Sequence, residues 1–123
     1  MKKLILILGL SLLSPFVYAE EPIDSYVAHL SAADHTNSDG KRLRSVGDIL
    51  RQDRANVHKF NIIDSEDQVD NTFADLKARE RIPMMLQRGH IDNTTKTAIL
   101  NGTPVVLVNI YKNRIEVFQQ WNI

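Results

Sequence analysis

One short segment of the chain, "SVGDILRQDRANVHKF" (residues 45–60), contains an acid, an imidazole and guanidinium groups close together. The acid is Asp53, flanked by Arg51 and Arg54, and His58 follows one helical turn after Arg54. A carboxylate and an imidazole can transfer protons, and guanidinium groups can hold an anion such as a phosphate. We therefore take Asp53, Arg54 and His58, together with His35 from an earlier loop, as candidate catalytic residues.

The position of Asp53 raises a question of its own. At about 100° per residue, the segment forms an amphipathic helix. The apolar stripe of this helix is Val46, Ile49, Leu50, Val57 and Phe60. Asp53 falls in the middle of this stripe, where a carboxylate must be paired, hydrogen-bonded or protonated. Since Arg54 lies off the stripe, we expect the partner to come from another segment, either the loop Asp34 to Gly40 or the run Lys41 to Arg44. Such a buried acid either ties down a loop or belongs to a site.

The loop "DHTNSDG" (residues 34–40) supplies the other candidate binding residues. Its members are small polar residues that favour turns. The candidate binding set is Asp34, His35, Asn37, Asp39, Arg51, Arg54 and His58. The loop fails the EF-hand pattern, because His35 stands where Asp is required and Val46 where Glu is required. An irregular metal site is the weaker alternative to a solvated turn, so we expect no metal and no cofactor.

The first nineteen residues resemble a secretory signal. A basic "MKK" precedes the apolar run Leu4 to Leu13, which is too short to span a bilayer, and "VYA" provides a cleavage pattern before Glu20. We therefore expect cleavage after Ala19, a bacterial source and a periplasmic or secreted protein. An uncleaved anchor is the less favoured alternative.

The composition limits the class of protein. The chain contains no cysteine, so neither a disulfide framework nor a lipid-anchored cysteine is available. Removal of Lys2 and Lys3 with the signal leaves 13 basic and 15 acidic residues, a formal charge of −2. This balance lacks the net positive charge that is typical of proteins that bind nucleic acid or an anionic membrane surface. Residues 20–123 are long enough for one domain with its own core.

Helix signals continue through the middle of the chain. Ser45 is a good N-cap for the first helix, and Ser65 with Gln68 has the spacing of a capping box for a second helix over about Glu66 to Arg79. Pro83 suits the first turn of a short helix that ends at Gly89. Asp92 caps a fourth helix, "NTTKTAIL", which ends at Asn101-Gly102.

The C-terminal segment has the pattern of a β-hairpin. Two alternating runs flank Lys112-Asn113, and a two-residue loop pairs Ile110 with Ile115 and Val108 with Val117. A lone hairpin is marginal in water, so we expect a third strand from residues 25–32. The predicted fold is a small α+β domain with about four helices on a short antiparallel sheet. We expect Phe118 and Trp121 to close the core, with an interface as the alternative.

Two functions remain open. The first is a small exported binding protein that does no chemistry, with an unknown protein or small ligand held by the loop Asp34 to Arg44 and the polar side of the first long helix. The second is a small secreted hydrolase of nuclease or phosphoesterase type. It would use His58 or His35 as base, Arg51 or Arg54 on the phosphate, and Asp53. No nucleophile elbow and no glycine-rich phosphate loop occur in the sequence, which favours the binding protein.

Overall fold

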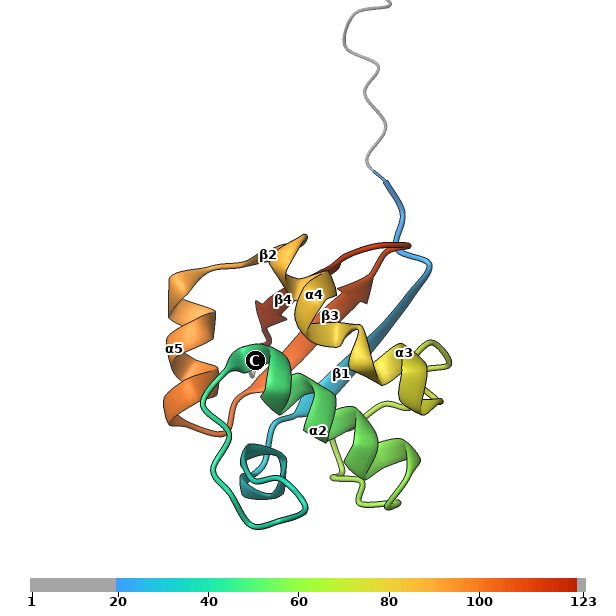
Figure 1. Ribbon diagram of the computed structural model, residues 1–123. Coiled ribbons are helices and arrows are strands. Elements are labelled where there is room, and N and C mark those ends of the chain that lie inside the picture. Colours follow the sequence, from blue (N-terminus) through green and yellow to red (C-terminus); the bar gives the residue numbers. More distant parts are fainter. Residues whose placement is uncertain (1–19, 122–123) are drawn as a thin grey trace, which may run out of the picture.

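The structure, a computed structural model, describes residues 20–121 and shows an α+β domain of two layers (Figure 1). The predicted signal segment lies outside the described residues. A four-stranded sheet has the order β1-β3-β4-β2. Its strands are β1 (Asp24–His29), β2 (His90–Ile91), β3 (Val105–Ile110) and β4 (Ile115–Gln119). Within residues 20–121 no helix is long and apolar enough to cross a membrane.

The predicted hairpin is confirmed, residue for residue. Ile110 pairs with Ile115 and Val108 with Val117, and the chain reverses at Lys112-Asn113. The expected third strand is β1, which pairs antiparallel with β3. Because strand side chains alternate between faces, one face of β1, β3 and β4 carries a set of apolar residues that are fully buried. These residues are Tyr26, Ala28, Val106, Val108, Ile110, Ile115 and Val117.

Helices cover this buried face (Figure 1). They are the 3-10 turn η1 (Ala32–His35) and the helices α2 (Val46–His58), α3 (Leu76–Glu80), α4 (Ile82–Gln87) and α5 (Asn93–Asn101). The predicted caps form, since Ser45 accepts a hydrogen bond from the Asp48 amide and Asp92 accepts one from the Thr95 amide. Ile49 and Leu50 of α2, with Ile99 of α5, complete the core.

The prediction of a helix over Glu66 to Arg79 is wrong. Residues 59–75 contain neither helix nor strand, and only Leu76–Glu80 is helical. The polar side chains that could have capped a helix bind β1 instead. Gln68 exchanges hydrogen bonds with the Val27 backbone, and Asp67 accepts a hydrogen bond from the His29 amide. This loop therefore covers the free edge of β1, which would otherwise leave backbone groups unpaired.

The sheet also has a fourth strand that the sequence pattern did not indicate. β2 lies parallel to β4 and has only two residues, so it has no periodicity to detect. It follows Gly89, where a side chain would overlap the Ile115 carbonyl oxygen on β4. Only glycine allows the chain to approach the sheet this closely.

The expectation that Phe118 and Trp121 close the core is wrong. Trp121 is 68% exposed and Phe118 is 37% exposed. Phe60, expected on the apolar stripe of the first helix, is likewise 43% exposed. α2 ends at His58, so the helical spacing no longer applies at residue 60.

Candidate functional site

The structure buries the guanidinium group of Arg54 completely and surrounds it with acids. Its Nε donates to Asp53 Oδ2 at 2.7 Å, and its Nη1 donates to Asp70 Oδ1 and to the Gln68 carbonyl oxygen, both at 2.9 Å. The guanidinium carbon lies 3.8 Å above the centre of the Tyr26 ring. Such charge-assisted bonds and a cation–π contact offset the loss of hydration that burial imposes.

Asp70 joins α2 to the loop that follows it. Besides accepting from Arg54, its Oδ1 lies 2.8 Å from Nε2 of His58, and its Oδ2 accepts from the Phe73 amide at 2.7 Å. Asp70 was not among the predicted site residues. Its only signal in the sequence is an acidic run, which is typical of an exposed helix start. A partner so far along the chain cannot be found by periodicity.

Asp53 is buried as predicted, but the prediction that its partner comes from another segment rather than from Arg54 is wrong. A long flexible arginine side chain can turn back to its neighbour although the two Cα positions point to different sides of the helix. The run Lys41 to Arg44 does not supply the partner either; Arg42 donates to the Leu100 carbonyl oxygen on α5. Asp34, from the predicted loop, does face Asp53.

Burial raises the pKa of the Asp53 carboxyl well above its usual value, although Arg54 opposes this shift. Burial also raises the pKa of Asp34, which accepts a hydrogen bond from Asn56 Nδ2 at 2.8 Å. The two facing carboxyl groups need a proton between them to form a hydrogen bond. Asp53 Oδ1 is buried and has no hydrogen-bond partner among the described residues.

His35 does not join this group. It is 1% exposed, and its Nδ1 and Nε2 lie 2.8 Å and 2.7 Å from the carbonyl oxygens of Ser31 and Ile99. Both nitrogens are therefore engaged, Nδ1 within η1 and its N-cap and Nε2 with α5. His35 is therefore not free to act as a ligand in the alternative metal site of the loop 34–40. Among residues 20–121 no cluster of three or more His, Cys, Asp or Glu could hold a metal ion.

The Asp53–Arg54–Asp70–His58 group, which we call the Arg54 cluster, is closed to solvent. The side chain of His58 is 9% exposed, and the other three are at most 1% exposed. None of these four side chains lines any of the five main hollows formed by residues 20–121. The cluster thus has charges suited to acid–base chemistry but no described route for a substrate. Its hydrogen bonds attach the loop 59–75 to α2.

A surface near the cluster is accessible and contains other predicted binding residues. Two adjoining hollows, of about 280 and 350 Å³, share Ser38, Gln52 and Phe60. Their remaining lining residues are Arg51, Ala55, Lys59, Leu76, Arg79 and Glu80 in the first and Ala33, Thr36, Asn37, Asn56 and Ile62 in the second. We call these residues together the Phe60 surface. It combines the predicted loop with the predicted side of α2, although Asp39 does not line it.

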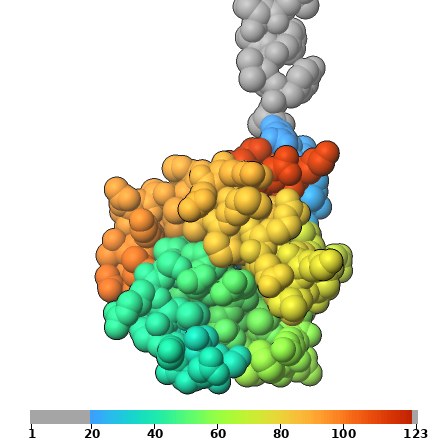
Figure 2. Space-filling model, viewed as in Figure 1, coloured from blue at the N-terminus to red at the C-terminus, as the bar shows by residue number. Residues whose placement is uncertain are grey.

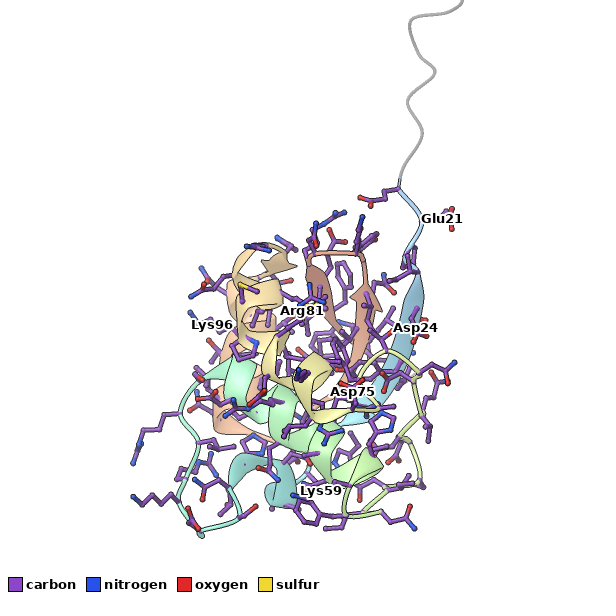
Figure 3. The ribbon with its side chains drawn as sticks, turned by 45° about the vertical axis from the view of Figure 1, so that its right-hand side comes forward. Glu21, Asp24, Lys59, Asp75, Arg81 and Lys96 are labelled. Atoms are coloured by element: carbon purple, nitrogen blue, oxygen red, sulfur yellow. The ribbon has the colours of Figure 1, made fainter. Side chains whose placement is uncertain are left out.

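Apolar groups and positive charges meet on the Phe60 surface. Leu76 is 61% exposed and Ile62 is 49% exposed, on either side of Phe60. Arg51 and Lys59 project from α2, and Figure 3 shows Lys59 at the end of that helix. The only acid that lines the two hollows is Glu80. Phe60 and Leu76 were not predicted here. Helical spacing placed Phe60 on the apolar stripe of the first helix, and Leu76 fell within the helix predicted over Glu66 to Arg79.

No family model, no curated protein and no solved structure matches this chain. The geometry of the described residues is therefore the basis for a functional assignment.

Proposed function

We propose that this protein is an exported binding protein without catalytic chemistry, and that its Phe60 surface holds a segment of another protein. The observation that carries the proposal is a group of exposed apolar side chains beside two hollows, at the end of the longest helix. Exposed apolar groups rimmed by polar residues are typical of protein interfaces. The closed Arg54 cluster supports a binding role over the hydrolase alternative.

The chemistry of the Phe60 surface indicates the kind of segment it would bind. An aromatic or aliphatic side chain would fill the hollow between Phe60 and Leu76. Acidic groups beside that side chain would meet Arg51 and Lys59. Arg51 lies only 3.6 Å from Asp48, but both side chains are more than 40% exposed, so this weak pair can open to a partner. An acidic peptide segment with one large apolar residue has the complementary features.

The proposal is tested with protein purified from cells that express the whole chain. Peptides are selected from a random displayed library, and their affinities are measured by fluorescence anisotropy. We expect selected peptides to carry an aromatic or aliphatic residue next to Asp or Glu. The Phe60→Ser variant should bind them at least about tenfold more weakly, because truncating a central apolar contact removes about 1–2 kcal/mol or more.

Phe118→Ser is the matched control for this experiment. Phe118 is exposed to a similar degree, but strand alternation places it on the opposite face of β4 from the buried Val117. This variant should keep the parent affinity. Equal loss in both variants, or full affinity in Phe60→Ser, would remove the Phe60 surface as the binding site.

Export is the other part of the proposal, and it rests on the first nineteen residues of the sequence. We expect the purified protein to begin at Glu20, after cleavage of the segment that ends at Ala19. Mass spectrometry of the intact protein measures this directly. A mass that retains residues 1–19 would contradict cleavage and would favour the membrane-anchor alternative.

A further inference from the structure

A separate groove, of about 460 Å³, lies at the other end of α2, and it shares no lining residue with the Phe60 surface. It is formed where the first turn of α2 meets α4, β2 and α5. These segments adjoin on the helical face of the molecule (Figure 2). A hollow of this size is within the range of small-molecule sites.

The floor of the groove is apolar because it is an opening into the core. Three of its residues pack against the core but remain partly accessible, namely Leu86, Ile91 and Leu100. Val46 and Pro83 extend this apolar lining. Gly47 lies between them and approaches Pro83 so closely that an added Cβ would be 2.9 Å from the Pro83 Cα. The absence of a side chain at Gly47 keeps α2 and α4 together below the groove.

Two cations border the same groove. Arg44 precedes the first turn of α2, and Lys96 projects from α5 (Figure 3). Both residues are exposed, and neither forms an ion pair among residues 20–121. No acidic residue lines the groove. An apolar floor with two unneutralised cations at its border matches a ligand that has an apolar body and an anionic head.

We propose that this groove binds a small amphipathic carboxylate, with its hydrocarbon body on Leu86, Ile91 and Leu100 and its carboxylate at Arg44 and Lys96. The carboxylate would exchange its hydration for two charge-assisted contacts. The hydrocarbon would cover apolar surface that the fold leaves open. Both halves of the ligand are required, since neither an exposed cation pair nor an open apolar floor binds tightly alone.

The probe is decanoate, used below its micelle concentration and titrated into isotope-labelled protein purified from cells that express the whole chain. We expect saturable amide shifts confined to residues 44–47, 83–91 and 96–100. Decanol, which lacks the charge, and butyrate, which lacks the chain, should each bind at least about tenfold more weakly. An absence of saturation with decanoate, or equal affinity for decanol, would overturn the proposal.

A charge-matched pair of double variants separates the groove from general electrostatic attraction. Arg44→Gln/Lys96→Gln should weaken decanoate binding by about tenfold or more. Lys77→Gln/Lys112→Gln removes two exposed cations elsewhere and should leave the affinity unchanged. Thermal melts establish that both variants are folded. Unchanged affinity in the first variant, or equal weakening in the second, would contradict the assignment of the carboxylate to Arg44 and Lys96.

Discussion

At the scale of single residues, Arg54 is the cation that compensates the buried acids around it. Its guanidinium group binds two acids at once and stacks on Tyr26. Replacing one partner of a buried ion pair is costly because the remaining charge keeps its burial but loses its compensation. Removing Arg54 would leave the buried carboxyl groups of Asp53 and Asp70 without this cation.

We therefore predict that Arg54→Gln lowers the free energy of unfolding by about 3–5 kcal/mol, measured by urea denaturation. Arg51→Gln is the control on the same helix. Its side chain is 45% exposed and its ion pair with Asp48 is long, so the loss should stay below about 1 kcal/mol. Similar losses in the two variants would show that the Arg54 cluster does not hold the loop to the helix.

The burial of Asp53 predicts how the stability of the protein depends on pH. Its pKa in the folded protein is raised, so the folded state binds the Asp53 proton more tightly than the unfolded chain does. The stabilisation from this proton is present below the unfolded pKa and is lost as the pH rises toward the folded pKa. Asp53→Asn, which mimics the neutral form, avoids this loss.

Urea denaturation at pH 4.5 and pH 7.5 measures this effect in the parent and in Asp53→Asn. We expect the variant to gain stability relative to the parent as the pH increases. A relative gain by the parent would instead show that Asp53 is ionised and paired with Arg54.

The sequence indicated that Asp53 is buried but did not indicate which groups surround it. Helical periodicity showed that this acid must be buried, and the structure agrees. Its surroundings depend on side-chain conformation and tertiary packing, since Arg54 turns back along the helix and Asp34 comes from η1. Likewise, helical spacing places Arg54 off the apolar stripe, whereas packing of the loop 59–75 buries its side chain completely.

At the scale of elements, local signals predicted the hairpin, the caps at Ser45 and Asp92, and the short helix begun by Pro83. Each depends on residues within a few positions of one another. The prediction of a helix over Glu66 to Arg79 was wrong because this segment is determined by contacts with residues far away in the sequence. Gln68 and Asp67 satisfy the distant edge of β1, and this long-range gain outweighs a local capping pattern.

Gly89 gives a prediction for an element boundary. A methyl group there would overlap the Ile115 carbonyl oxygen, and a backbone atom inside the sheet cannot move away cheaply. Gly89→Ala should therefore lower the free energy of unfolding by about 3 kcal/mol or more. Gly102→Ala is the control, since its nearest contact is the Ala98 carbonyl oxygen at 3.2 Å. Thermal and urea denaturation measure the stability of both variants. Equal losses of stability would show that β2 does not need the close contact between Gly89 and the Ile115 carbonyl oxygen.

At the scale of the whole molecule, the helical layer places two different surfaces at opposite ends of α2. The Phe60 surface lies at its C-terminal end, and the cationic groove lies at its N-terminal end. The predicted fold class could be derived from the sequence, because it follows from the order of helices and strands. The Phe60 surface could be derived only in part, through its loop residues and the polar side of α2. Its exposed apolar residues and the groove could not be derived, because they come from segments that meet only in the folded protein.

The most direct test of the account is an amide shift map of labelled protein titrated with an acidic, aromatic peptide selected as described above. We predict shifts at residues 36–38, 51–62 and 76–80, with the groove near Arg44 unaffected. Shifts confined to the face of the sheet that carries Phe118, or to the groove, would contradict the assignment of partner binding to the Phe60 surface.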